Sequence, residues 1–395
     1  MLQQRNQRRP WRDAHLCGEK WTIVRRPLER DVVTRMTLPG RACLMALLVA
    51  GVGLGAASGQ SKLRSGPNVG DKIPAFSGGD HSGKQQTFES LRGPNGLLLL
   101  FTRSADWCIY CKTNLVQLER KREEFEKQGI RMAAITHDSK EIVANFARRA
   151  GIHYPLIGDA EAKIIRAFDV LNDTIPPTNE RYGMPNPVEY LIDAKGVVTA
   201  KYFDEDYTKR FTAGNILVRE LGADSGSPRT QKQTDHLTVT TSASDSIVHG
   251  GNRVALVLEV DLKPKMHVYS PEVKGYIPIE WKMDSADGLT FHDAGFPPSK
   301  LLHLPAIDEI VPVYEGRFRV LRDVLLGKPD QVEPLLNAEG QLVLKGTFRY
   351  QACDDKVCYL PQTLPVEWKF QWQAHDRTRV PEDLQRVGRR PGAGR

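Results

Sequence analysis

A polar segment, Gly222–His236, separates two halves of the chain whose hydrophobic residues follow different periods. Its Gly, Ser, Pro and Gln content is typical of a linker. Before this segment, strand-like apolar runs alternate with helical patterns, whereas after it only short, alternating, strand-like runs occur. The sequence therefore predicts an α/β domain over residues 66–221, a linker over residues 222–236 and an all-β domain over residues 237–373.

The first half contains a continuous apolar run, Leu97–Phe101, which is typical of a strand buried on both faces. Apolar residues then recur at helical spacing until Gly129. Val188–Ile192 and Val197–Phe203 flank a turn at Asp193–Gly196 and predict a hairpin. Further strands are expected at Ile130–Ile135 and Tyr154–Ile157, and helices at Lys140–Arg149 and Ala160–Phe168. This order predicts a sheet sandwiched between helices.

The second half is rich in Val, Thr and aromatic residues, with Gly, Pro and Asp clusters between the runs. This pattern is typical of a β-sandwich. Strands are expected at Leu237–Thr241, Arg253–Val260, Ile279–Lys282, Phe318–Leu321, Leu342–Tyr350 and Val366–Trp372. The basic tail, residues 374–395, has the composition of a disordered segment.

The positive charge of the chain is concentrated at its N-terminus. The net charge is +7, but residues 1–59 alone carry ten Arg or Lys against four Asp or Glu. The rest is close to neutral, so no nucleic-acid surface is expected. Ala42–Ala57 is apolar, shorter than the roughly 20 residues that span a bilayer, and followed by Ser58-Gly59-Gln60. Residues 1–59 are therefore predicted to be an extension and a signal peptide beginning at Met36, which directs the protein across the inner membrane to the periplasm. An uncleaved segment would instead be a membrane tether.

Cleavage would remove Cys17 and Cys43 and leave two close pairs of cysteines. These pairs are Cys108 with Cys111 and Cys353 with Cys358. A chain of this length does not need disulfides to stabilise its core, so two short-range pairs favour redox chemistry over structural cross-linking.

The first pair follows a predicted strand and begins a predicted helix, in Trp107-Cys108-Ile109-Tyr110-Cys111. Three-residue spacing at a helix start brings the two sulfurs within bonding distance, and the free N–H groups there favour a thiolate. Cys108 is the predicted nucleophile and Cys111 the partner that resolves the mixed disulfide. Half of a zinc site and an inert bridge are the alternatives. No histidine lies near the motif, so no metal is expected.

Residues 69–222 resemble the thioredoxin-like superfamily, in its redoxin or exported-reductase branch. The resemblance rests on Val69-Gly70-Asp71-Lys72-Ile73-Pro74, on the Trp-Cys-x-x-Cys motif and on Pro187-Val188-Glu189-Tyr190-Leu191-Ile192-Asp193. It implies a cis-proline at Pro187, preceded by Asn186, beside the disulfide, and a substrate-positioning role for Asn186, Pro187 and Trp107. Pro185 is the second candidate for the cis-proline, and a trans turn proline is the alternative.

Peroxiredoxins share this fold and are the competing enzyme class. In that family a proline stands seven residues, and a threonine three residues, before the peroxidatic cysteine. Here these positions are Phe101 and Ala105, and the family's arginine is replaced by Pro187. These departures count against peroxide reduction.

The second pair is separated by four residues between strand-like runs, so a hairpin would bring Cys353 and Cys358 face to face. A structural staple is the alternative to redox activity. Residues 235–372 resemble the N-terminal domain of the DsbD thiol:disulfide interchange protein, in Tyr-Gln-x-Cys-x(4)-Cys-Tyr-x-Pro, in Met266–Pro271 and in Ile277–Ile279. The resemblance implies an immunoglobulin-like sandwich for this domain. It also implies that Cys358 reacts with partner proteins, that Cys353 resolves, and that Tyr314 caps the pair.

Together these features predict an exported thiol:disulfide oxidoreductase that uses two cysteine pairs and neither a metal nor an organic cofactor. Its expected partners are protein thiols and disulfides, together with a separate membrane or soluble electron donor. The linker would let the two pairs exchange electrons within one chain. A thiol peroxidase and a partner-binding module with a structural disulfide are the alternatives.

Overall fold

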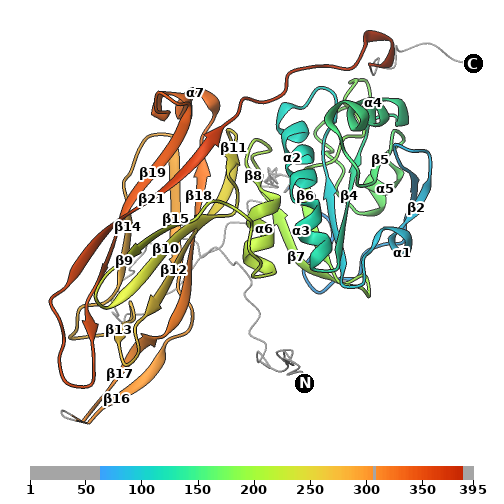
Figure 1. Cartoon of the computed structure of the whole chain (residues 1–395). Helices are drawn as coiled ribbons and strands as arrows, with labels where there is room; N and C mark the ends of the chain where they lie inside the picture. The colour runs from blue at the N-terminus through green and yellow to red at the C-terminus, as the bar shows by residue number, and fades with distance from the viewer. Residues whose placement is uncertain (1–62, 306–307, 386–395) are drawn as a thin grey trace, which may run out of the picture. The chain divides into compact units, whose positions relative to one another are not determined.

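A five-stranded sheet forms the centre of the first domain in a computed structural model that describes residues 63–305 and 308–385 (Figure 1). The strand order is β5-β4-β3-β6-β7. β3 (Gly96–Phe101), β4 (Ile130–Thr136) and β5 (Leu156–Gly158) are parallel, β6 (Val188–Ile192) pairs antiparallel with β3, and β7 (Val198–Phe203) pairs antiparallel with β6. The signal peptide predicted in residues 1–59 lies outside the described residues.

Both faces of this sheet are covered, because β3 alternates its leucines between two apolar cores. Leu98 and Leu100 join a core with helices α2, α3, α4 and α6, whereas Leu97 and Leu99 join a second core with α1 and α5. The helices are α1 (Phe88–Leu91), α2 (Ile109–Arg120), α3 (Arg122–Lys127), α4 (Lys140–Ala150), α5 (Lys163–Ala167) and α6 (Ala213–Glu220), and a hairpin of β1 (Ser77–Gly79) and β2 (Gln85–Thr87) precedes them. The predicted α/β sandwich and the β6–β7 hairpin are therefore confirmed.

The second domain is built from strands in three antiparallel sheets. One contains β9 (Thr230–Gln233), β10 (Leu237–Ala243), β12 (Asn252–Leu262), β15 (Leu289–Gly295) and β18 (Arg317–Leu326). The second contains β14 (Glu280–Met283), β19 (Gln341–Tyr350) and β21 (Gln362–Trp372), with β11 (Ile247–Val248) added in parallel. The third contains β13 (His267–Tyr269), β16 (Lys300–Leu304), β17 (Glu309–Glu315) and β20 (Ala352–Cys353). A short helix, α7 (Pro329–Val332), follows β18.

The core of this domain lies between the first two sheets. β19 buries every second residue, which is the pattern of a strand with one face toward a core. Trp281 of β14 and Trp368 of β21 stack with their ring centres 5.3 Å apart, and β10, β12 and β18 supply aliphatic side chains from the facing sheet. The predicted all-β sandwich is confirmed.

Two segments differ from expectation. The predicted linker contains β9, which pairs with β10, and Ser225 is buried with its Oγ donating to the Ala243 carbonyl at 2.6 Å. Residues 374–385 of the predicted disordered tail are ordered and contact the first domain, for example through Arg379 and Asp106. Backbone pairing and long-range ion pairs organise both segments, and neither interaction requires an apolar sequence pattern. Residues 386–395 lie outside the described residues.

The two domains share a sheet and a polar interface. β8 (Arg210–Phe211) follows β7 and pairs in parallel with β12. Asn215 Nδ2 and Arg219 Nε both donate to Asp323 Oδ1 at 2.9 Å. Val218 packs in a small apolar cluster with β12. The segment between the domains is therefore not a free tether.

Candidate active site

The first cysteine pair lies where β3 leads into α2. Cys108 is the N-cap residue of α2, with extended backbone, and its Sγ accepts a hydrogen bond from the Cys111 N–H at 3.3 Å. The two cysteines form a disulfide with their Cα atoms 5.2 Å apart. Cys108 is only 4% exposed and Cys111 is fully buried. Cys108, the predicted nucleophile, is therefore largely covered.

A buried carboxylate braces the loop that carries Cys108. Asp138, just after β4, accepts hydrogen bonds from the Ala105 N–H at 2.6 Å and from the Ser104 hydroxyl at 2.8 Å. Ser104 Oγ in turn accepts from the Asp106 N–H at 3.0 Å. Burial raises the pKa of Asp138 to about 6, and these hydrogen bonds oppose the shift. Asp138 thus holds the loop through three linked polar groups.

Two guanidinium groups lie close to the ring of Trp107. The Arg103 Cζ is 4.8 Å, and the Arg181 Cζ 4.6 Å, from the Trp107 ring centre. Arg103 also lies 3.9 Å from the ring centre of Tyr207. Burial lowers the pKa of Arg103. Cation–π contacts fix the indole, which is partly exposed beside Cys108.

The prediction of a cis-proline at Pro187 is wrong, because the described residues contain no cis peptide bond. The same finding applies to the second candidate, Pro185. The Asn186 N–H donates to the Val170 carbonyl at 2.7 Å, and Pro185 bridges Leu171 as in an antiparallel ladder. This pairing holds the segment extended with trans bonds, which X–Pro sequences already favour. It also occupies the N–H of Asn186, a residue expected to position a substrate.

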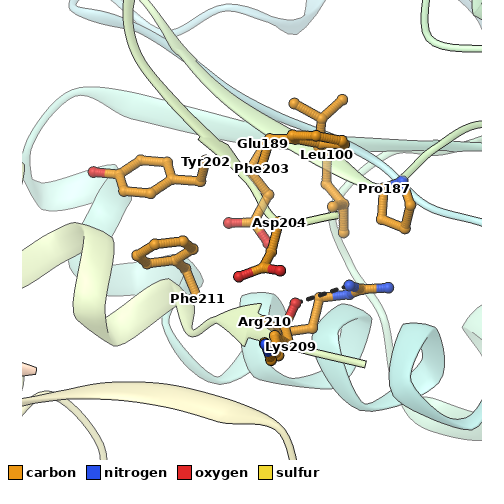
Figure 2. Close-up of a pocket in the computed structure, with 10 residues that line it drawn as sticks. Leu100, Pro187, Glu189, Tyr202, Phe203, Asp204, Lys209, Arg210 and Phe211 are labelled. Atoms are coloured by element: carbon orange, nitrogen blue, oxygen red, sulfur yellow. Dashed lines mark hydrogen bonds between the residues drawn. The ribbon is translucent and has the colours of Figure 1, made fainter. Parts of the chain in front are cut away.

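Glu189 is a buried acid that the sequence reasoning missed. It stands on β6 opposite Leu100 of β3, the strand that leads to Cys108. Burial raises its pKa to about 7, and the Asn114 amide on α2 and the charge of Arg210 oppose this shift. Glu189, Asp204 and Arg210 border a cavity of about 10 Å³, which is room for about one water molecule (Figure 2). A glutamate within an otherwise apolar strand was the available signal.

The second pair forms a disulfide across a hairpin. Cys353 ends β20, and it pairs directly with Cys358 after a four-residue turn. The Asp354 carboxylate closes the turn by accepting from the N–H groups of Lys356 and Val357, each at 2.8 Å. Cys353 is buried whereas Cys358 is exposed. This asymmetry leaves Cys358 as the sulfur that a partner can reach.

The aromatic residue beside this pair is Tyr269, not Tyr314. The Tyr269 hydroxyl lies 3.7 Å from Cys358 Sγ and 3.8 Å from Cys353 Sγ, and Tyr276 stacks on its ring. Tyr314 instead packs in the main β-core and donates its hydroxyl to the Pro297 carbonyl. On β13, Tyr314 pairs with Val268, the residue that precedes Tyr269. Because successive side chains of a strand alternate in direction, Tyr269 and Tyr314 lie on opposite faces of the sheet.

The two disulfides lie toward opposite ends of β21. Cys358 stands shortly before this strand, which has 11 residues and therefore spans about 35 Å. After the strand, His375 Nδ1 hydrogen-bonds Thr113 Oγ1 of α2 at 2.8 Å. In this arrangement the two pairs do not meet, so the expected direct exchange between Cys108 and Cys358 within one chain is not supported.

No metal site was expected at either pair. Within residues 63–305 and 308–385, no three His, Cys, Asp or Glu side chains are grouped so that they could hold a metal ion. In the same part of the chain, no helix is both long and apolar enough to cross a membrane.

Two known protein families match separate parts of this chain. Residues 69–201 match the AhpC/TSA family, and residues 234–368 match the N-terminal domain of the thiol:disulfide interchange protein DsbD. The chain thus joins a redoxin domain of thioredoxin-like fold to a DsbD N-terminal-like domain, as the resemblances implied.

Two curated relatives each match about a third of this chain. The thiol-disulfide oxidoreductase ResA of Bacillus subtilis (strain 168) is 28% identical over 130 residues, which cover 33% of this chain and 64% of the relative. Alkyl hydroperoxide reductase C of Staphylococcus aureus (strain Mu50) is 28% identical over 133 residues, which cover 31% of this chain and 62% of the relative. The matched region is therefore less than two thirds of either relative. The crystal structure of the peroxidoxin BcpB from Mycobacterium tuberculosis is similar to 35% of this chain and 86% of its own, with 22% identity and a TM-score of 0.32.

Proposed function

We propose that this protein is an exported thiol:disulfide oxidoreductase that acts on protein partners through Cys108/Cys111 and Cys353/Cys358. The observation that carries the proposal is the hydrogen bond from the Cys111 N–H to the Cys108 sulfur at the start of α2. A negative charge on this sulfur is favoured by that donor and by the helix dipole. The likeness to ResA supports the same chemistry.

Reduction of a partner disulfide at the first site takes two displacements. The Cys108 thiolate attacks one partner sulfur, which forms a mixed disulfide and releases the other partner sulfur as a thiolate. Cys111 then loses its proton and attacks the Cys108 sulfur, which releases the second partner thiolate and forms the Cys108–Cys111 disulfide. Two electrons pass to the partner, and its two thiolates take up protons. The reverse sequence oxidises a dithiol partner.

The second site is proposed to use Cys358 first. Cys358 is exposed and Cys353 is buried against Tyr269 and β13, so a partner would meet Cys358 and Cys353 would resolve. The hydroxyl of Tyr269, which is near both sulfurs, is placed to donate to a thiolate there. A separate protein would supply or remove electrons at each site, because the pairs lie far apart. Export to the periplasm is proposed from the apolar segment in residues 1–59 alone.

Peroxide reduction is the second candidate, because an alkyl hydroperoxide reductase is among the relatives. In that reaction the Cys108 thiolate would take one peroxide oxygen as sulfenic acid and release an alcohol or water. Cys111 would then displace water and form the disulfide. The apolar residues Phe101 and Ala105 stand where peroxiredoxins carry Pro and Thr, so the donor for the peroxide oxygen that the threonine supplies is missing from this position.

Trapping of mixed disulfides tests the proposal at both sites. Cys111→Ser and Cys353→Ser each remove a resolving thiol, and each variant should accumulate a covalent complex with a reducible protein such as insulin. The matched controls, Cys108→Ser and Cys358→Ser, should form no covalent complex with insulin at the cysteine pair that carries the substitution. Equal trapping by the variant and its control, with the linkage mapped by mass spectrometry, would contradict the assigned nucleophile.

A further inference from the structure

The C-terminal segment, residues 374–385, lies on the start of α2. Lys112 Nζ donates to the Thr378 carbonyl at 2.6 Å, and His375 hydrogen-bonds Thr113. The ring of His375 also meets the ring of Tyr110 edge-on, with centres 4.6 Å apart. Tyr110 stands between the two cysteines and Lys112 directly follows Cys111, so these contacts lie beside the disulfide motif on its helical side.

The firmest contact is on the other side of the motif, at Asp106. Arg379 donates to both oxygens of this carboxylate, from Nε at 2.8 Å and from Nη2 at 2.6 Å. The Val380 N–H donates to the same carboxylate at 2.8 Å. Asp106 is 1% exposed and stands two residues before Cys108. A carboxylate so deeply buried requires such partners, and the C-terminal segment supplies them.

A further ion pair of the segment, between Arg149 and Asp376, is partly exposed. Arg149 pairs with Asp376 at 2.8 Å, and both side chains are 34% exposed. Lys112 lies 3.7 Å from the same carboxylate. Val380 is the buried apolar side chain of the segment. Charged contacts of this kind weaken in salt and form reversibly, unlike a packed apolar interface.

We propose that the C-terminal segment is a releasable cover that keeps protein partners away from the Cys108–Cys111 disulfide. The inference rests on the proposed function, because a disulfide that exchanges with proteins needs a sulfur open to attack along the S–S axis, and Cys108 is 4% exposed. The segment follows β21 directly, so it stays attached to the protein when it leaves α2 and can return.

The contacts of the C-terminal segment also indicate which kind of partner could displace it from α2. A partner would need an extended segment with a guanidinium group for Asp106 and a backbone carbonyl for Lys112, as Arg379 and Thr378 supply here. The partner class is therefore a polypeptide that presents an arginine beside its reactive cysteine. Access to Cys108 then depends on competition between this polypeptide and the chain's own segment.

Size-selective labelling of the reduced full-length chain tests the cover. Cys108 is labelled with N-ethylmaleimide or with a maleimide carrying a 5-kDa polyethylene glycol chain, and the labelled peptide is identified by mass spectrometry. Arg379→Ala should raise the ratio of the large-probe rate to the small-probe rate about tenfold. Arg377→Ala removes an exposed arginine of the same segment and should leave the ratio within twofold of the wild type.

Amide hydrogen exchange of residues 374–385 reports in the same samples whether the segment has left α2. If Arg379→Ala leaves the segment protected, Arg379→Ala combined with Asp376→Ala removes both ion pairs. A released segment with an unchanged labelling ratio overturns the proposal. Maleimide labelling needs no exchange partner, so it tests the cover separately from the proposed function. A variant whose Cys108 reacts with the large probe but forms no mixed disulfide with a protein would contradict the proposed function without contradicting the proposed cover.

Discussion

Glu189 should make the stability of the first domain depend on pH. Its carboxyl is fully buried, and its pKa is raised from 4.5 to about 7, chiefly by burial. The folded state therefore holds the proton more tightly than the unfolded state. The stability that the neutral acid contributes is complete below pH 4.5 and is lost as the pH rises through about 7. At about 1.4 kcal/mol per unit, the loss is roughly 3 kcal/mol.

The variant Glu189→Gln keeps the shape of the side chain but cannot ionise. Between pH 4.5 and 8, the wild type should therefore lose roughly 3 kcal/mol of unfolding free energy relative to Glu189→Gln, measured by urea denaturation with both disulfides intact. Asp138, which titrates at about 6, is present in both proteins and cancels from the comparison. The exposed control Glu333→Gln should follow the wild type at every pH. A constant difference in unfolding free energy between the wild type and Glu189→Gln over this range would show that the Glu189 carboxyl does not titrate there.

Three further experiments have defined outcomes. Asp138→Ala leaves the Ala105 N–H and the Ser104 hydroxyl without their acceptor, so it should lower the unfolding free energy, measured with urea, by about 1–3 kcal/mol. A decrease below about 0.5 kcal/mol would show that water replaces the carboxylate. Tyr269→Phe removes the hydroxyl beside the second pair and should raise the thiol pKa of Cys358, followed by alkylation rate against pH, whereas Tyr314→Phe should not. Hydrogen peroxide should oxidise Cys108 no faster than an ordinary thiolate of the same pKa in stopped-flow measurements, and a much faster rate would favour the peroxidase.

The parts of the fold that follow from local pattern were predictable from the sequence. The apolar run before Cys108 marks β3, and the four residues between Cys353 and Cys358 predict the hairpin that pairs them. The cover on α2 was not predictable, because Arg379 and Asp106 are 273 residues apart and an ion pair between them leaves no periodic signal.

Strand register and backbone pairing explain the other differences between the sequence-based predictions and the structure. Tyr269 and Tyr314 are both plausible caps by composition, and only the pairing of β13 with β17 shows which one faces the sulfurs. The trans bond before Pro187 depends on a hydrogen bond to Val170, which is a tertiary contact. β9 is polar along its length, so its place beside β10 rests on backbone hydrogen bonds that composition does not reveal.

The proposed function requires that both disulfides are redox-active. Their reduction potentials can be measured by equilibrating the full-length chain in graded thiol–disulfide buffers, alkylating the free thiols and quantifying each pair by mass spectrometry. We predict that Cys108/Cys111 and Cys353/Cys358 both titrate between about −120 and −270 mV, the range of exchanging dithiols. A Cys353–Cys358 bond that stays oxidised below about −300 mV, where structural disulfides lie, would contradict the claim for the second domain and leave it a staple.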